Sequence, residues 1–332
     1  MKETAYWHAE ADGEARCELC PHGCRIGEGQ AGICRVRGVR HGQLVELSYG
    51  RMSALNIDPI EKKPLYHFLP ASSIFSVGGW GCNFRCVFCQ NWSISQQMIE
   101  AGERHDPESL VADAESRRSR SIAYTYNEPL VNFEFVIGCC RVARRQGLRN
   151  VLVTNGYINP EPAAELLALV DAANIDIKSM DDAFYRTQCG GSVEPVLAFA
   201  AQAREAGCHI ELTNLVIPGL NDSDSDFARL ATWIESALGP ATPLHLSAYH
   251  PQYRMNIHAT PTVDLQRGHR ICSQYLCYVY LGNVFTETGR NTHCPSCGAL
   301  LVQRTGTHTR VTGLSGRNCA QCGRESEIVV DE

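Results

Sequence analysis

The sequence lacks a long hydrophobic run, both in its interior and near its beginning. No apolar stretch of the 332-residue chain approaches the roughly 20 residues that a helix needs to cross a bilayer, so we expect no membrane span. The first residues, MKETAYWHAEADGEARC, interleave acidic and basic side chains and offer no apolar core, which argues against a secretory signal peptide. We therefore expect a cytoplasmic protein.

An excess of positive charge is also lacking. The chain carries 30 Lys and Arg against 36 Asp and Glu, a formal net charge of -6. Without a general positive field, binding to bulk nucleic acid or to anionic lipid is disfavoured. A mean hydropathy of -0.20 suits a soluble globular protein. The composition thus predicts a folded protein whose partners are neither nucleic acid nor membrane.

Cysteine, by contrast, is abundant, with 17 residues. In a reducing cytosol such cysteines are core residues, metal ligands or redox groups rather than disulfides, and their spacing distinguishes these uses. Most of them fall into three groups along the chain. The remainder lie in apolar stretches or beside expected strand ends and are interpreted as core or loop residues: Cys139, Cys140, Cys189, Cys208, Cys272 and Cys277.

The first group comprises Cys17, Cys20, Cys24 and Cys34, set among glycines and a proline. So many turn-forming residues leave little hydrophobic core, so a bound metal is the expected source of stability. We predict a small metal-stabilised lobe over residues 1 to about 50, within an N-terminal unit of residues 1–70 that includes a linker. Zinc and an auxiliary iron–sulfur cluster both fit this site, with a slight preference for zinc.

The last group comprises Cys294, Cys297, Cys319 and Cys322, two Cys-x2-Cys pairs separated by a spacing typical of a structural zinc ribbon. Zinc is therefore favoured there over free thiols or a second cluster. We predict a small zinc-ribbon-like unit over residues 286–332. Together, the two terminal groups predict one or two structural zinc ions.

The segment between these units alternates short β-rich runs with helical stretches, the pattern of a parallel sheet built from βα units. We predict an α/β core over residues 71–285 that forms a partial (β/α)6 TIM-like barrel, with a doubly wound sheet as the alternative. In either architecture the active site lies at the carboxyl ends of the strands. The expected strands are residues 74–79, 121–126, 150–154, 173–178, 209–217 and 243–249.

The central cysteine group is Cys82-x3-Cys86-x2-Cys89, which follows the first of these runs. Three thiolates on one loop can hold a [4Fe–4S] cluster and leave its fourth iron open. Ordinary electron-transfer clusters have four protein ligands, so an open iron indicates a site for a cofactor or substrate. S-adenosylmethionine (SAM) can bind such an iron through its amino and carboxylate groups. The alternatives are three buried core cysteines or a zinc site.

The residues around these cysteines carry a resemblance. GCNFRCVFCQNWSIS (81–95) resembles the signature of the radical SAM superfamily, in the branch that includes the pyruvate formate-lyase activating enzymes. The segments NEP (127–129), TNG (154–156), DIK (176–178) and YHP (249–251) resemble strand-end SAM contacts of that branch. The chain as a whole is similar to the radical SAM members of the AmmeMemoRadiSam system.

The resemblance implies roles for individual residues. Glu128 matches the carboxylate that holds the SAM amino group, and Lys178 would lie near the SAM carboxylate and act with the cluster cysteines in catalysis. Asn127 stands where the branch has glycine and Val153 where it often has aspartate, so contacts made there would differ. The implied SAM-binding residues are Phe88, Asn127, Glu128, Thr154, Asn155, Asp176, Lys178 and His250.

The resulting functional hypothesis is a radical SAM enzyme. It would cleave SAM reductively at the cluster to give a 5′-deoxyadenosyl radical, which would act on an unidentified substrate such as a peptide or protein segment. An electron donor such as flavodoxin or ferredoxin is implied. The alternatives are a radical SAM enzyme that modifies RNA and a non-catalytic metal-binding scaffold.

Overall fold

The centre of the protein is an eight-stranded sheet. The computed structural model describes residues 1–11, 13–97, 102–306 and 308–330. Seven strands run parallel, and β8 pairs antiparallel with β9 at one edge. The strands, in their order across the sheet, are β16 (Val279–Gly282), β15 (Leu244–Ala248), β14 (His209–Val216), β13 (Ala172–Asp176), β12 (Arg149–Thr154), β11 (Ser121–Tyr124), β9 (Ser73–Gly78) and β8 (Ala54–Pro59).

All six strand runs expected from the sequence are strands of this sheet, so the α/β class with a parallel sheet is confirmed. The prediction of six strands was one short, because β16 adds a seventh parallel strand. This strand has only four residues and lies in an apolar run that precedes the last cysteine group. Its pairing with β15 is a tertiary feature that a short run does not indicate.

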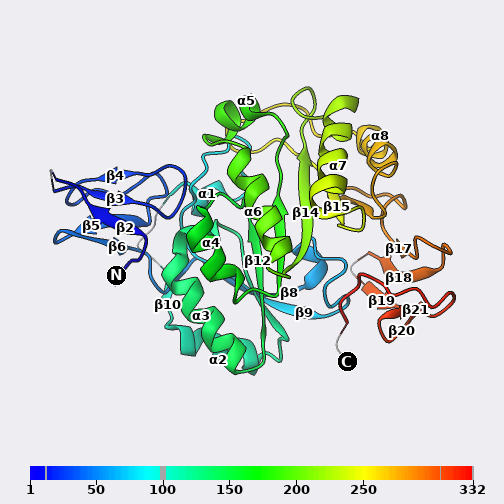
Figure 1. Ribbon diagram of the computed structural model, residues 1–332, viewed down its shortest axis with the longest axis horizontal. Coiled ribbons are helices and arrows are strands. Elements are labelled where there is room, and N and C mark those ends of the chain that lie inside the picture. The colour runs from blue at the N-terminus through cyan, green and yellow to red at the C-terminus, as the bar shows by residue number, and fades with distance from the viewer. Residues whose placement is uncertain (12, 98–101, 307, 331–332) are drawn as a thin grey trace.

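Helices connect the strands and cover the outer side of the sheet (Figure 1). Local signals fix their starts: Asp106 caps α2, accepting a hydrogen bond from the Ser109 N–H at 2.7 Å, and Ser223 caps α7 in the same way. The longer helices are α2 (Pro107–Ser116), α3 (Phe133–Arg145), α4 (Pro160–Leu167), α6 (Glu194–Glu205), α7 (Asp224–Leu238) and α8 (Thr262–Cys272). The shorter ones are η1 (Ile60–Lys62), α1 (Trp92–Ser95), η2 (Pro129–Asn132), α5 (Asp182–Phe184) and η3 (Tyr185–Cys189).

Two small β units flank the central sheet on opposite sides (Figure 1). The N-terminal one contains β1 (Lys2–Glu3), β2 (Trp7–Ala9), β3 (Ala15–Cys17), β4 (Arg25–Ile26), β5 (Arg37–Arg40) and β6 (Gln43–Glu46), and β7 (Arg51–Met52) pairs with β10 (Glu103–Arg104). The C-terminal one contains β17 (Thr292–His293), β18 (Leu300–Thr305), β19 (His308–Val311), β20 (Leu314–Ser315) and β21 (Asn318–Cys319). The predicted boundaries after residues 70 and 285 stay a prediction, and β8, within the first predicted unit, is an edge strand of the central sheet.

A buried polar network closes the amino-terminal end of the sheet. Glu211, on β14, accepts hydrogen bonds from the backbone N–H groups of Tyr66 and His67 at 2.9 and 2.7 Å and contacts His245 Nε2 at 2.7 Å. Burial alone would raise the pKa of Glu211, but hydrogen bonds from His209 and His245 hold it well below its usual value. The network therefore anchors the segment around residue 66 beneath the strands.

This network makes stability depend on pH through His67. Burial, only partly offset by Glu211, lowers the pKa of His67 to about 3, whereas histidine in an unfolded chain titrates near 6.5. The unfolded state therefore binds more protons between these values. His67 should therefore cost no stability above pH 6.5. Below this value, the free energy of unfolding should fall by about 1.4 kcal/mol per pH unit. His209, His245 and Arg304 also act on His67 and oppose its protonation.

Melting temperatures of the wild type and the His67→Gln variant, measured from pH 7.5 to pH 5.5, test this expectation. The variant is compared with the wild type at each pH. Because both proteins carry the same cysteine sites, acid effects on these sites cancel. The wild type should lose stability more steeply than the variant. Parallel pH profiles would show that His67 does not titrate as the burial of its ring requires.

Candidate active site at the strand ends

One pocket collects residues from the carboxyl ends of nearly all the parallel strands. Seven strands spaced by about 4.8 Å would span roughly 29 Å if flat. Because residues after β9 and after β16 line the same pocket, the sheet must curve strongly around it. The lining residues include Cys82, Phe84, Cys86, Phe88, Cys89, Asn91, Tyr126, Asn127, Glu128, Thr154, Asn155, Asp176, Lys178, Thr213, Leu215, Ser247 and Asn283.

The three central cysteines lie together in this pocket, as the sequence predicts. The Cys82 Sγ accepts hydrogen bonds from the Phe84 N–H at 3.3 Å and from Asn155 Nδ2 at 3.7 Å. The Cys89 Sγ lies 3.2 Å from the Ser95 Oγ. Hydrogen bonds to the ligand sulfurs are one of the means by which proteins tune iron–sulfur clusters.

The spacing of these sulfurs tests what they can bind. In the described part of the chain, only Cys294, Cys297, Cys319 and Cys322 bring three or more ligand atoms within 4.8 Å of one another. Cys82, Cys86 and Cys89 therefore converge on one pocket without being close enough to share a single ion. Each thiolate of a [4Fe–4S] cluster binds a different iron, so wider spacing is expected there. The central cysteines fit a cluster better than a zinc ion.

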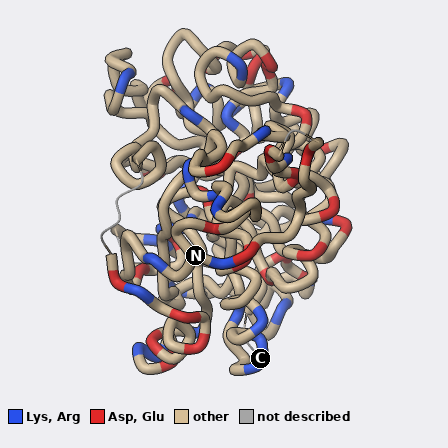
Figure 2. The backbone as a smooth tube through the Cα atoms, turned by 90° about the vertical axis from the view of Figure 1, so that its left-hand side faces the viewer, with Lys and Arg blue, Asp and Glu red and all other residues tan. Residues whose placement is uncertain are grey.

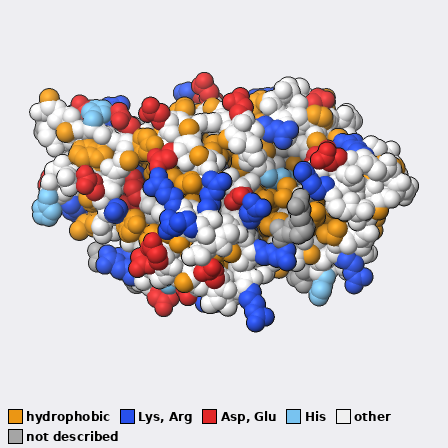
Figure 3. Space-filling model, turned by 60° about the horizontal axis from the view of Figure 1, so that its bottom comes forward, with side chains coloured by type: hydrophobic (Ala, Val, Ile, Leu, Met, Phe, Trp, Pro, Cys, Tyr) orange, Lys and Arg blue, Asp and Glu red, His pale blue; other side chains and the backbone are white. Residues whose placement is uncertain are grey.

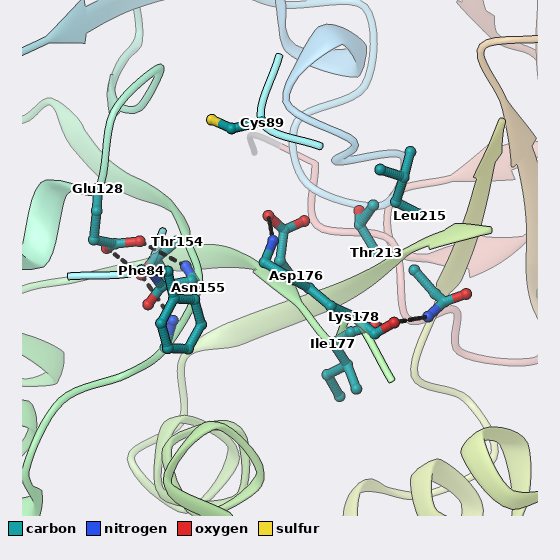
Figure 4. A network of polar contacts seen from close by, with 12 residues as sticks. Phe84, Cys89, Glu128, Thr154, Asn155, Asp176, Ile177, Lys178, Thr213 and Leu215 are labelled. Carbon is teal, nitrogen blue, oxygen red and sulfur yellow. Dashed lines mark hydrogen bonds and ion pairs between the residues drawn. The ribbon is translucent and has the colours of Figure 1, made fainter. Parts of the chain in front are cut away.

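Glu128 ties two neighbouring strand ends together (Figure 4). Its Oε1 accepts hydrogen bonds from Thr154 Oγ1 at 2.6 Å and from the Leu130 N–H at 3.1 Å, and its Oε2 accepts one from the Asn155 N–H at 2.8 Å. Burial raises the pKa of Glu128 to about 7, although these hydrogen bonds act in the opposite direction. A buried carboxylate here is held in one orientation facing the pocket.

Asp176 and Lys178 form an ion pair at the end of β13, with Lys178 Nζ 2.9 Å from Asp176 Oδ2 (Figure 4). Burial alone would lower the pKa of Lys178, but the attraction of Asp176 raises it well above its usual value. The lysine therefore stays charged within the pocket. Its backbone is fixed by the Tyr185 hydroxyl, which accepts from the Lys178 N–H at 3.0 Å.

Of the residues predicted to bind the central cluster or SAM, the pocket brings together all but one. Phe88, Thr154 and Asn155 line the pocket with the residues described above. Asn127 lines it too, but its side chain also donates to the backbone oxygens of Trp80 and Gly81 at 3.0 and 3.1 Å. His250 is exposed and is not among the lining residues, so its predicted contact with SAM stays a prediction.

Several lining residues were missed by the sequence analysis. Tyr126, Ser247 and Asn283 each stand at or near a strand end, so a search of all polar residues at these ends would have found them. Thr213 lies within β14, where no strand-end signal marks it. Cys189, interpreted as core or loop, is buried behind the cysteine loop. Its carbonyl oxygen accepts from the Arg85 N–H at 2.7 Å, a contact that no sequence pattern signals.

The four C-terminal cysteines lie close enough together to hold one metal ion. The Sγ atoms of Cys294 and Cys322 are 3.6 Å apart, and those of Cys297 and Cys319 are 3.7 Å apart. Zinc–sulfur bonds of about 2.3 Å at tetrahedral angles separate sulfurs by about 3.8 Å. The donor set therefore fits a four-thiolate zinc site, and the identity of the metal stays a prediction.

Comparisons with known proteins agree with this site. The family model of the Radical SAM superfamily matches residues 78–231 of this chain. An uncharacterized protein of Methanocaldococcus jannaschii is 40% identical over 336 residues, covering 99% of this chain and 100% of that protein. The GTP 3′,8-cyclase of Geobacter sulfurreducens is 30% identical over 251 residues, 73% of each chain. The pyruvate formate-lyase 1-activating enzyme of Escherichia coli is 25% identical over 181 residues, covering 51% of this chain and 71% of that enzyme.

Among solved structures, a radical SAM methyltransferase from Sphaerobacter thermophilus aligns with a TM-score of 0.52 at 15% identity, covering 70% of this chain and 71% of that chain. A likeness at this identity speaks for the fold alone. Within the described residues, no helix is both long and apolar enough to span a membrane.

Proposed function

The chain belongs to the radical SAM superfamily, and from this premise we propose that it cleaves SAM reductively at a [4Fe–4S] cluster held by Cys82, Cys86 and Cys89. The observation that carries the proposal is the shared pocket of these three thiols, the Glu128 carboxylate and the Lys178 ammonium. When cluster and SAM are bound, one electron converts SAM to methionine and a 5′-deoxyadenosyl radical that abstracts hydrogen from a substrate. We interpret the curved sheet around the pocket as the predicted partial barrel.

The residues of the pocket are suited to hold SAM by its charged groups. A carboxylate offers about four lone-pair sites, and three at Glu128 already accept protein hydrogen bonds. The remaining site can accept the SAM amino group. The charged Lys178, held by Asp176, can pair with the SAM carboxylate. Asn155 would link the two regions, because its backbone binds Glu128 and its side chain contacts Cys82.

The proposed substrate is a peptide or protein segment, with reducing equivalents from a donor of the flavodoxin or ferredoxin type. The relationship to an activating enzyme supports this assignment. The relationship to a GTP 3′,8-cyclase shows that the superfamily also takes small substrates. The proposal of a peptide or protein substrate therefore rests on the relationship to the activating enzyme. A comparison of glycyl-radical protein and GTP as substrates would separate the two classes.

Modification of RNA is the less favoured candidate. Acidic and basic residues are interspersed on the side of the molecule that carries the N-terminal lobe (Figure 2). Lys and Arg side chains gather on the lower side (Figure 3), where Arg118 and Arg120 line a depression at the amino ends of β9 and β11. These arginines lie at the opposite end of the strands from the cysteine pocket. A nucleic acid bound there would not reach the proposed site of chemistry.

The test is anaerobic reconstitution of the full chain with iron and sulfide, followed by reduction with dithionite. We expect a cluster EPR signal that changes when SAM is added, together with formation of 5′-deoxyadenosine. Zinc bound by the central cysteines, with no response to SAM, would overturn the proposal in favour of the metal-binding scaffold.

Within this proposal, replacing Glu128 by glutamine should weaken SAM binding. A hydrogen bond to a charged group contributes about 1.5–3 kcal/mol, so the dissociation constant should rise about 10- to 150-fold. The glutamine amide would also direct a donor at the Thr154 hydroxyl or the Asn155 N–H. Equilibrium dialysis of reconstituted protein with labelled SAM measures the effect.

Glu165→Gln is the matched control. Glu165 also accepts hydrogen bonds from two side chains, Tyr6 at 2.7 Å and Arg141 at 2.9 Å, but it does not line the pocket. The affinity of the Glu165→Gln variant for SAM should stay at the wild-type value. Unchanged affinity in Glu128→Gln, with normal iron content, would restrict Glu128 to organising the strand ends.

A further inference from the structure

The four N-terminal cysteines line a second cysteine pocket, which the function proposed above does not use. Cys17 ends β3, Cys20 and Cys24 lie in the following turn, and Cys34 comes after the glycine-rich segment. Cys17 and Cys34 are buried, and Cys20 and Cys24 are half-buried. Apolar side chains complete the lining, among them Leu19, Ile26, Ile33 and Val131. The pocket is thus a mostly apolar chamber with four thiols.

The separation of these thiols argues against a single ion. In the same structure the C-terminal cysteines reach the spacing of a tetrahedral zinc site. Of the residues described, which include all four N-terminal cysteines, no other group brings three ligand atoms within 4.8 Å. The N-terminal thiols therefore resemble Cys82, Cys86 and Cys89: they converge on one pocket, but no three of them reach the spacing of the C-terminal four-thiolate group. That relation fits a cluster, in which each thiolate binds its own iron.

An independent feature of this pocket points to an anionic occupant. Arg37 lines it with a side chain that is 1% exposed, and the Arg37 Nε is buried with no hydrogen-bond partner among the described residues. Its other nitrogens are satisfied: Nη1 pairs with Glu134 at 3.0 Å, and Nη2 donates to the Ala5 carbonyl oxygen. A buried donor without a partner is unfavourable. A cluster with four thiolate ligands is anionic, and its sulfurs can accept this hydrogen bond.

The two cysteine pockets are neighbours. Asn83 lines the N-terminal pocket and directly follows Cys82 in the chain. His22, between Cys20 and Cys24, lies with its Nε2 2.8 Å from the Asn83 carbonyl oxygen. Gly81 packs against the turn that contains Cys34 so closely that a Cβ would lie 2.5 Å from the Cys34 carbonyl oxygen. Thus the segments that carry the two sets of thiols are in direct contact.

We infer that Cys17, Cys20, Cys24 and Cys34 hold a second [4Fe–4S] cluster that passes electrons singly to the central one. This replaces the zinc preferred from sequence alone, and its relay role rests on the proposed radical SAM function. These four thiolates would hold the group. When bound, it would supply one-electron transfer between a flavodoxin- or ferredoxin-type donor and the group held by Cys82, Cys86 and Cys89, with no bond formed or broken.

The site itself is tested in the reconstituted full chain by metal analysis and Mössbauer spectroscopy. The Cys82→Ala/Cys86→Ala/Cys89→Ala variant leaves the N-terminal lobe intact and should retain about four iron atoms, against about eight in the wild type. Its EPR signal should not respond to SAM. Zinc at the N-terminal cysteines, or no iron in this variant, would overturn the second cluster.

The relay is tested with Cys20→Ala/Cys24→Ala. This variant should keep a SAM-responsive EPR signal from the central cluster. If neither the variant nor the wild type shows that signal, the result counts against the proposed radical SAM function and not against the relay. Relative to the wild type, the variant's loss of deoxyadenosine formation should be at least about tenfold larger with reduced flavodoxin than with dithionite. The small reductant dithionite can reduce either cluster directly. Equal losses with both reductants would overturn the relay. His22→Ala, which leaves all ligands in place, should show a smaller loss of the same kind.

Discussion

Formation of 5′-deoxyadenosine should fall by more than about 100-fold when Cys86 is replaced by alanine, since loss of even an outer partner of a metal ligand costs 10- to 100-fold. Cys86 is buried at the centre of the cysteine loop, and its carbonyl oxygen accepts from the Cys89 N–H at 3.2 Å. Two remaining thiolates cannot hold three irons of a cluster. The measurement is chromatographic assay of deoxyadenosine after reduction with dithionite.

The matched control for this experiment is Cys272→Ala. Cys272 is a buried cysteine at the end of α8, and it is not among the residues that line the pocket. We expect this variant to retain its cluster and at least about a third of the activity, with the loss of stability of about 1–2 kcal/mol usual for a small core truncation. Equal loss of iron in both variants would show that truncation of any buried cysteine, rather than loss of a ligand, releases the iron.

Much of this site was predictable because its chemistry follows from topology. Glu128, Thr154 and Lys178 stand at the ends of parallel strands, and such ends meet at one edge of a sheet. The central cysteines carry a dense local signal, three thiols within eight residues, after the first strand. The strands themselves were recognisable from β-branched and aromatic residues bounded by polar turns. Local pattern and global fold agree in these segments.

What escaped prediction depends on contacts between segments far apart in the chain. The network under Glu211 joins residues near 66, 211 and 245, and nothing in the sequence near 66 indicates burial beneath the sheet. The choice between zinc and a cluster at the N-terminal cysteines depends on the separation of sulfurs, which sequence spacing does not specify. His250 resembles a SAM contact by sequence but is exposed and not among the lining residues, so its contact with SAM stays a prediction.

Loss of the C-terminal metal should unfold the unit that contains β17 to β21. The described residues of this unit bury only a small apolar cluster around Leu301, Val302 and Ile328. Metal binding supplies about 10–16 kcal/mol of apparent free energy in small zinc domains, which cannot fold without it. The Cys322→Ser variant should therefore bind much less than one zinc and melt on the order of 10 °C lower. Cys277→Ser is the control, because both cysteines are exposed but only Cys322 belongs to the metal site.

Unfolding of this unit should also loosen the closed end of the sheet. The Val329 N–H donates to the His67 carbonyl oxygen at 2.7 Å, the Leu69 N–H donates to the Val329 carbonyl oxygen at 2.8 Å, and Arg304 donates to that of Tyr66 at 2.7 Å. In Cys322→Ser, hydrogen exchange of the amides near residue 67 should therefore accelerate along with that of β18. Fast exchange in β18 alone would mean that the Glu211 network closes the sheet without help, because Glu211 binds the Tyr66 and His67 amides directly.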